Sequence, residues 1–281
     1  MHRAARQNAI LEALRTHGSA TVGELTRSMN VSDETVRRDV KAMASKGLVE
    51  RVHGGVMLPD LNREPGFQSR MQQNAQAKRA IARKAAELIA NGDSLMLDTG
   101  STTAYVARAL KDHTDLFVVT NSVDIARALA NGKKGNKVYV AGGELRGDDG
   151  ATFGPTAHDF VRRFRTRYAV ISVGALHSDG GVMDFHLQEA EFCQTVLEQA
   201  AQVVAVADAS KFRHQAPVKV CDLQRIDTLI TDRRPPEPFL KRLRENEVRL
   251  LVADDTGRRP VADADDAATA AGAGDATRGA G

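Results

Sequence analysis

Short apolar runs alternate with helical patterns over most of the chain, and this alternation limits the folds that it can adopt. Seven such runs occupy 94–98, 116–120, 137–141, 168–173, 203–208, 226–231 and 248–252. Helical patterns lie between most of them, for example at 102–110, 123–130 and 189–200. Nearly continuous apolar strands that alternate with helices predict a parallel sheet covered by helices on both faces. The stripe of Ile81, Ala85, Leu88 and Ile89 predicts a helix before this sheet, ended by the Asn91-Gly92 pair.

In open α/β sheets, ligands bind beyond the carboxyl ends of the strands. The first run leads into Asp98, Gly100 and the hydroxyl residues Ser101, Thr102 and Thr103, where a helix begins. A glycine, three hydroxyls and a helix N-terminus together predict an anion site suited to a phosphate. The loop lacks the lysine of a P-loop and the spacing of a dinucleotide fingerprint. The alternative is an ordinary capped helix start with solvated hydroxyls.

Other strand ends are also polar. Asn121 follows the second run and Lys211 follows the fifth, while 142–146 after the third run is glycine-rich and charged. Short polar loops end most parallel strands, so each is a weak signal alone. Together they favour a pocket for a sugar phosphate, with Asn121 and Lys211 beside the 98–103 loop.

The segment 1–58 has a different pattern, of three short helices. Ile10 and Leu14 lie on one stripe of the first helix. Thr21, followed three positions later by Glu24, predicts a capping box at the start of the second, and Ser32 is a favourable N-cap for the third. A capped third helix after a tight turn is typical of a helix-turn-helix DNA reader.

In the third helix, Val36, Val40 and Met43 recur at the spacing of one buried face. The opposite arc carries Glu34, Arg38 and Lys41, with Thr35 and Arg37 on its flanks. The segment 48–58 predicts two short strands around Gly54-Gly55, a hairpin that would carry Arg51 and His53 as a wing. Lys and Arg outnumber Asp and Glu over 1–58, a balance that permits nucleic-acid binding. The alternative is a small helical packing domain whose exposed arc is only solvated.

Composition divides the chain into four parts. We expect a DNA-binding domain at 1–58, a linker at 59–73, an α/β domain at 74–252 and a disordered tail at 253–281. The linker is polar and has Pro65-Gly66 at its centre, although Phe67 and Met71 could dock on a neighbouring surface. The tail is dominated by Ala, Gly and Asp and has no aromatic side chain. Its apolar surface is therefore too small to offset the entropy of ordering.

The stretch VSDETVRRDVKAMASKGLVERVHGGV, residues 31–56, resembles the winged helix-turn-helix signature of the DeoR family of bacterial transcriptional regulators. Paired arginines before an aspartate and a closing His-Gly-Gly are that family's hallmark. The resemblance implies DNA-facing roles for Ser32, Thr35, Arg37, Arg38, Arg51 and His53. It leaves open which of them meet bases and which meet phosphates.

The resemblance extends to about Asp232 through LMLDTGSTT, VVTNS, AGGELR, VGALHSDGG and ADASKF. These look like the sensor domain of the family, whose fold is similar to ribose-5-phosphate isomerase and CoA-transferase folds. The resemblance implies a regulator, usually a repressor, that forms a homodimer or homotetramer on operator DNA and responds to a phosphorylated sugar or polyol. Several segments look most like the glycerol-3-phosphate repressor branch, which makes glycerol 3-phosphate the first candidate effector. Residues 183–200 depart from that branch.

An enzyme is the alternative of a different class. A sugar-phosphate isomerase needs a carboxylate base and donors for an enediolate, and Glu189, Asp184 and Lys211 could supply them. Glu189 also suits a helix N-terminus electrostatically, and a fold alone does not confer activity. We therefore expect no catalysis, no cofactor and no metal site, since the eight histidines show no ligand spacing.

No apolar run approaches the length that a membrane-spanning helix requires. The N-terminus also lacks the apolar segment of a signal peptide. We therefore expect a cytoplasmic protein without a membrane partner.

Overall fold

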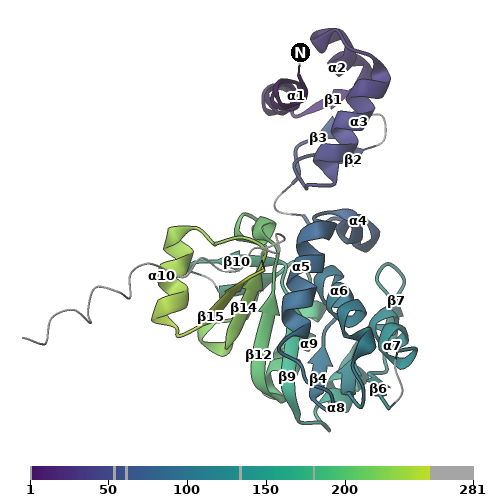
Figure 1. Ribbon diagram of the computed structural model, residues 1–281, viewed down its shortest axis with the longest axis vertical. Coiled ribbons are helices and arrows are strands. Elements are labelled where there is room, and N and C mark those ends of the chain that lie inside the picture. The colour runs from purple at the N-terminus through teal and green to yellow at the C-terminus, as the bar shows by residue number, and fades with distance from the viewer. Residues whose placement is uncertain (1, 53–54, 61–62, 133–134, 180, 254–281) are drawn as a thin grey trace, which may run out of the picture.

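The computed structural model describes residues 2–52, 55–60, 63–132, 135–179 and 181–253. A small N-terminal domain stands above a larger α/β domain, joined to it by a narrow connection (Figure 1). The expected tail lies outside the described residues except for Ala253. That residue is buried, and its N–H donates to Thr231 O at 2.7 Å, so it continues the α/β domain.

All seven predicted strands form one sheet, in the order β15-β14-β12-β9-β4-β5-β6, and every neighbouring pair is parallel. The fold-class prediction is therefore confirmed. The strands are β4 (Ser94–Leu97), β5 (Phe117–Thr120), β6 (Lys137–Val140), β9 (Thr166–Ser172), β12 (Ala200–Val206), β14 (Thr228–Thr231) and β15 (Arg249–Val252).

Helices cover both faces of the sheet because strand side chains alternate between two apolar clusters. Leu95 and Leu97 belong to the cluster beneath one helical layer, and Met96 belongs to the other. The first layer contains α5 (Ala75–Ala86), α6 (Ser101–Ala109) and α7 (Val123–Ala130), and the second contains α8 (Pro155–Val161), α9 (Leu187–Glu198) and α10 (Glu237–Glu245). The helices expected at 102–110, 123–130 and 189–200 are thus confirmed as α6, α7 and α9.

Two features differ from the sequence-based expectation. Helix α5 ends at Ala86 rather than at Asn91-Gly92, because Leu88 and Ile89 continue in tighter three-residue turns. Additional short antiparallel strands also surround the parallel sheet. They are β7 (Glu144–Arg146) paired with β8 (Ala151–Phe153), and β11 (Gly181–Asp184) paired with both β10 (Ala175–His177) and β13 (Val218–Cys221). Strands this short show no clear sequence period.

The N-terminal domain has the predicted helix-turn-helix. It contains α1 (Arg3–His17), α2 (Val22–Met29) and α3 (Asp33–Ala44), with a small sheet of β1 (Ser19–Thr21), β3 (Gly55–Met57) and β2 (Glu50–Val52). Thr21 and Glu24 form the predicted capping box, and Ser32 caps α3. The hallmark aspartate of the signature, Asp39, is buried in α3 and pairs with Arg6 of α1 at 2.7 Å. Its role is therefore to hold α3 against α1.

The segment between the domains is ordered where it is described. Residues Phe67–Gln72 form a short helix, α4, and the Phe67 side chain is buried in the cluster under α5 and α6. The Tyr105 hydroxyl of α6 donates to Met71 O at 2.9 Å. Both docking residues suggested by the sequence therefore contact the α/β domain. We call residues 63–74 the strap.

Candidate effector and DNA-binding sites

The loop after β4 is buried at the carboxyl edge of the sheet. The Asp98 carboxylate accepts from Ser172 N, at 3.0 and 3.2 Å to its two oxygens, which ties the end of β4 to the end of β9. Burial raises the pKa of Asp98 well above its usual value. A carboxyl in this environment can form a hydrogen bond with a ligand hydroxyl, as a donor when it is protonated and as an acceptor when it is ionised.

Gly100 allows the close approach that this loop needs. A Cβ at this position would lie 1.9 Å from Ser172 Oγ, so any side chain would push the loop off β9. Gly100 is also the N-cap of α6 and provides no side-chain cap for it. Ser101, Thr102 and Thr103 form the first turn and are buried, and the Thr103 hydroxyl donates to Gly100 O at 3.0 Å. The first turn of α6 thus combines hydroxyls with a helix N-terminus, as predicted.

Asn121 and Lys211 lie at the same edge. The strand order places β5 and β9 on either side of β4, with β12 beyond β9. Asn121 follows β5 and is fully buried, and its Nδ2 donates to Thr152 O at 3.2 Å. Lys211 lies in the 3-10 turn after β12 and is also buried.

Sequence reasoning missed two cations here, Lys78 and Arg70. Lys78 is 3% exposed, and burial lowers the pKa of its ammonium to about 7. The buried carboxylate of Asp208 is attracted by both Lys78 and Lys211. Burial would raise the pKa of Asp208, but this attraction, together with hydrogen bonds from Ser210, holds that pKa below its usual value. Lys78 could have been found, because it lies one helical turn before Ile81 on the buried stripe of α5.

At the same carboxyl edge, acidic residues gather around Glu189. Arg70 pairs with Glu64 at 2.9 Å within the strap, and Arg146 pairs with both Asp149 and Glu189. A cleft of about 460 Å³ opens here, and its lining includes Glu64, Arg70, Arg146 and Glu189. The edge therefore has a cationic end near Lys78 and an end rich in carboxylates near Glu189.

The carboxylates at that end repel one another. Burial, followed by repulsion from Asp184 and Glu64, raises the pKa of Glu189 to about 7. Burial also raises the pKa of Asp184 to about 6, with a further contribution from Glu64. Ligand hydroxyls that donate hydrogen bonds to these carboxylates would offset part of the free-energy cost of burying their charges.

Glu64, His186 and Glu189 place possible metal ligands within 4.8 Å of one another. Glu64 is already paired with Arg70, and Glu189 with Arg146. Both carboxylates therefore have a positive partner without an ion. The ion pair with Arg146 also accounts for the position of Glu189 without a role as a catalytic base.

The strap closes this edge. Phe67 N donates to Asp148 Oδ2 at 3.0 Å, and the Lys78 ammonium donates to Arg70 O. Asn74 Nδ2 donates to Asp208 Oδ1 at 2.9 Å. The segment that leads out of the N-terminal domain is thus fastened over the strand ends by both charged and neutral contacts.

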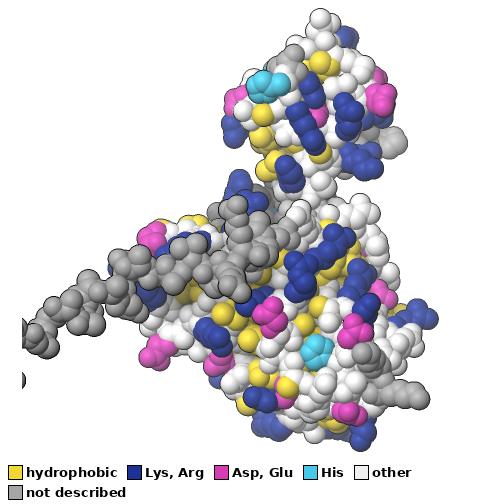
Figure 2. Space-filling view, in the orientation of Figure 1, with side chains coloured by type: hydrophobic (Ala, Val, Ile, Leu, Met, Phe, Trp, Pro, Cys, Tyr) yellow, Lys and Arg dark blue, Asp and Glu magenta, His cyan; other side chains and the backbone are white. Residues whose placement is uncertain are grey.

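The N-terminal domain presents basic side chains to solvent (Figure 2). Arg37 and Arg38 are exposed on α3, as predicted. Arg37 and Lys41 line a groove of about 470 Å³ with Arg51 of the hairpin, whereas Arg38 lies outside that lining. Ser32 and Thr35 lie at the start of α3, where their hydroxyls hydrogen-bond to each other at 2.9 Å. His53 lies outside the described residues.

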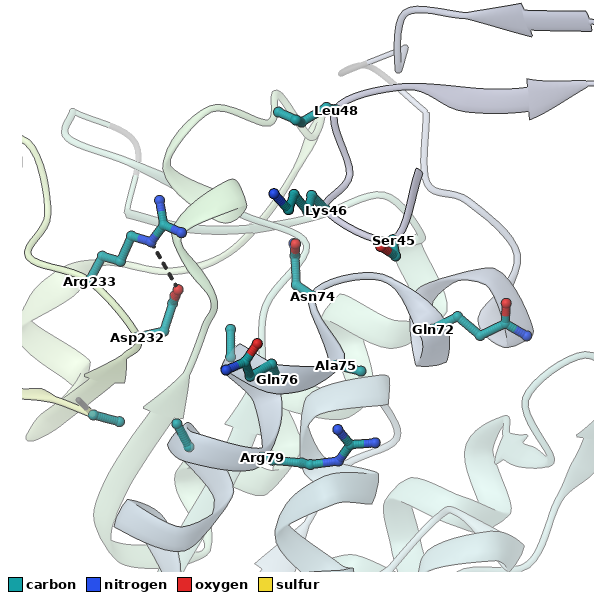
Figure 3. Close-up of a pocket in the computed structure, with 13 residues that line it drawn as sticks. Ser45, Lys46, Leu48, Gln72, Asn74, Ala75, Gln76, Arg79, Asp232 and Arg233 are labelled. Atoms are coloured by element: carbon teal, nitrogen blue, oxygen red, sulfur yellow. Dashed lines mark ion pairs between the residues drawn. The ribbon is translucent and has the colours of Figure 1, made fainter. Parts of the chain in front are cut away.

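A second cleft, of about 750 Å³, separates the two domains (Figure 3). Ser45, Lys46 and Leu48 line it from the N-terminal domain, and Asn74 and Arg233 from the other side. Asn74 N donates to Ser45 O at 3.0 Å across the domain boundary.

Comparison with known proteins agrees with this architecture. A family model described as the DeoR-like helix-turn-helix domain matches residues 6–61, and one described as the DeoR C terminal sensor domain matches residues 73–233. The chain belongs to the DeoR family. The resemblance stated from the sequence is thereby confirmed, and the two domains are called the reader and the sensor below.

Named relatives cover nearly the whole chain. The "Glycerol-3-phosphate regulon repressor" of Escherichia coli (strain K12) is 33% identical over 250 residues, which are 89% of this chain and 99% of the relative. The "HTH-type transcriptional repressor CsqR" of the same organism is 33% identical over 88% of this chain and 94% of its own length. Among solved structures, ribose 5-phosphate isomerase from Plasmodium falciparum is similar with a TM-score of 0.34 and 16% identity, over 48% of this chain and 51% of that one. Within the described residues, no helix is long and apolar enough to cross a membrane.

The crowding of carboxylates predicts a stabilising substitution, Asp184→Asn. The amide oxygen can still accept from His186 N, a bond of 3.0 Å in the native protein. The charge is removed, however, and at pH 8 the variant should gain on the order of 1–3 kcal/mol of unfolding free energy. Because burial raises the pKa of Asp184 from 3.8 to about 6, the gain should develop as the pH rises across that interval. Urea unfolding at pH 4.5 and pH 8 measures it, with the exposed Asp159→Asn as control. An Asp184→Asn protein that is no more stable than the native one at pH 8 would contradict the conclusion that burial and repulsion among these carboxylates cost stability.

Proposed function

We propose that this protein is a DNA-binding transcriptional repressor whose operator affinity changes when the sensor binds a phosphorylated sugar or polyol. The observation that carries the proposal is the charge balance at the carboxyl edge, where two buried ammonium groups, those of Lys78 and Lys211, are attracted to the one buried carboxylate of Asp208. Buried charge without a full complement of counter-charge is costly. A phosphate dianion would supply the missing negative charge beside the first turn of α6.

The two ends of the edge suit the two parts of such an effector. The phosphate would lie against Ser101, Thr102 and the ammonium groups of Lys78 and Lys211, with Asn121 and Arg70 nearby. The hydroxyls would face the acidic end, including Asp98 and Glu189. Glycerol 3-phosphate is the first candidate, since relatives are named for its regulon.

The reader would place α3 in the major groove, as helix-turn-helix proteins do. Arg38 is the best candidate for a base contact because it is exposed outside the groove that Arg37 shares with the wing. Arg37, Lys41 and Arg51 would then meet phosphates, with Ser32, Thr35 and His53 completing the DNA-facing set. Two copies of the chain on paired half-sites, as a dimer or tetramer in the cytoplasm, would give the operator its symmetry.

An isomerase-like enzyme tethered to DNA is the competing proposal. It requires a free carboxylate base, and Glu189 is paired with Arg146 at 2.7 Å. The two relatives described above are named as repressors. We therefore propose that Glu189 binds hydroxyls and does not transfer protons to carbon. Turnover of a sugar phosphate by the purified protein would favour the enzyme.

Arg38→Ala should weaken specific operator binding by about 1–3 kcal/mol if Arg38 contacts a base. Fluorescence anisotropy with DNA from upstream of the protein's own gene, at fixed salt, measures this loss. Arg244→Ala, which removes an exposed arginine on α10, is the charge-matched control. Equal operator affinity for the native protein and Arg38→Ala would show that Arg38 does not contact an operator base.

Lys78→Met should abolish the response to the effector while operator binding persists. The buried ammonium has a pKa of about 7, and a bound phosphate would raise that pKa by stabilising the charged form. Effector binding by the native protein should therefore take up a proton above pH 7, and its affinity should fall between pH 7 and pH 9 by up to about tenfold per pH unit.

The measurement is operator release by glycerol 3-phosphate and a panel of sugar phosphates, with effector affinity measured by calorimetry at each pH. Lys84→Met, on the exposed face of α5 and paired with Glu87, is the matched control. An undiminished response in Lys78→Met would refute the phosphate site. Operator binding that no phosphate compound alters in the native protein would refute the sensor proposal and leave the reader intact.

A further inference from the structure

Asn74 contacts both domains at once. It lies between α4 and α5 in a left-handed conformation, with φ 52° and ψ 30°. Its backbone N–H donates to Ser45 O at 3.0 Å, and Ser45 is the C-cap of α3 in the reader. Its side-chain Nδ2 donates to Asp208 Oδ1 at 2.9 Å in the sensor. In Figure 3, Asn74 lies below Ser45 and Lys46 at the start of α5, within the cleft between the domains.

The sensor end of this connection depends on the proposed effector site. Asp208 is 2% exposed, and Oδ1 also accepts from Ser210 N at 3.0 Å and Ser210 Oγ at 2.6 Å. Its charge is stabilised by electrostatic attraction from Lys78 and Lys211. A phosphate bound to those ammonium groups would compete with Asp208 for them. Occupancy of the site would therefore alter the group to which the Asn74 side chain is bonded.

The reader end of the connection is the end of α3. The turn that follows α3 passes over the Asn74 side chain, since a Cβ on Gly47 would lie 3.7 Å from Asn74 Nδ2 and 3.9 Å from Oδ1. Gly47 has a φ of 65°, a left-handed conformation that favours glycine. Because Asn74 N is bonded to the C-cap of α3, a displacement of Asn74 would move the end of that helix, which carries Arg37 and Arg38.

We infer that Asn74 is the positioning residue through which occupancy of the effector site is transmitted to the recognition helix. The hydrogen bond to Asp208 changes when the effector site is occupied, and the hydrogen bond to Ser45 fixes the position of the end of α3. This inference rests on the proposed function, because it assigns the regulation of the same site. It requires two arrangements of the Asn74–Asp208 contact that differ in effector affinity.

Asn74→Gly separates the two bonds. Glycine adopts the left-handed conformation readily and keeps the backbone N–H for Ser45, but it removes the side-chain bond to Asp208. Gln73→Gly is the matched control, since it adds the same backbone freedom at the preceding position and leaves Asn74 in place. Operator affinity is measured with and without glycerol 3-phosphate, and with any sugar phosphate that releases the native protein. We expect Asn74→Gly to bind operator and effector but to lose the change of about fivefold or more that ordinary coupling between sites provides. Gln73→Gly should retain it.

A second arm needs neither effector nor operator. Lys211→Met removes one cation beside Asp208, and hydrogen exchange of the amides of residues 45–48 then measures the end of α3 in the full-length protein. We expect Lys211→Met to change that exchange in the native background and in Gln73→Gly, but not in Asn74→Gly. An unchanged exchange in the native background, or the same change in Asn74→Gly, would overturn the inference. If no phosphate compound changes the operator affinity of the native protein, the proposed function is refuted. The second arm would still decide the role of Asn74.

Discussion

The burial of charge at one edge of the sheet is the constraint on which the rest of this structure depends. Seven parallel strands end there, and the residues that follow them include Asp98, Asp208 and Lys211. Burial raises the pKa of Asp98 and lowers that of Lys78, so the charged form of each is disfavoured. Buried charges of this kind need close hydrogen-bond partners. The strap provides two such partners, Arg70 O for Lys78 and the Asn74 amide for Asp208.

The same strap leads directly into the reader and therefore connects the proposed effector site to the DNA-binding domain. A segment that both covers a ligand site and continues into a DNA-binding domain responds to the ligand if binding changes its contacts. Phe67 and Met71 fix its middle against α6. Asn74 fixes its end to both Asp208 and Ser45. The hydrogen bond from Asn74 to Ser45 thus joins the two domains beside Asp208, where the effector would act.

Much of this organisation is visible in the sequence, and the exceptions have physical reasons. The central strands were predictable because a strand buried on both faces is apolar throughout, and the edge strands β6 and β15 because they remain rich in apolar residues although they are partly exposed. Thr21 and Ser32 were predictable because a capping side chain serves its own helix. The environment of Lys78 was missed because it comes from another part of the chain: Lys78 lies in α5, whereas Asp208, which attracts it, follows β12. Arg70 was missed because it lies in a segment whose composition predicts a linker. The segment around Pro65-Gly66 has the composition of a linker, yet Phe67 and Met71 find a surface only once α5 and α6 are packed. Short strands such as β10 and β11 exist only through their pairing.

The central claim is that a phosphorylated effector binds under the strap at the carboxyl edge. Hydrogen exchange of the full-length protein, followed through a titration with glycerol 3-phosphate or the sugar phosphate that releases operator, tests it most directly. The account predicts changed protection in residues 63–74 and 98–103, saturating at the effector concentration that releases operator. Release of operator with unchanged protection in both segments would place the effector elsewhere and contradict the account.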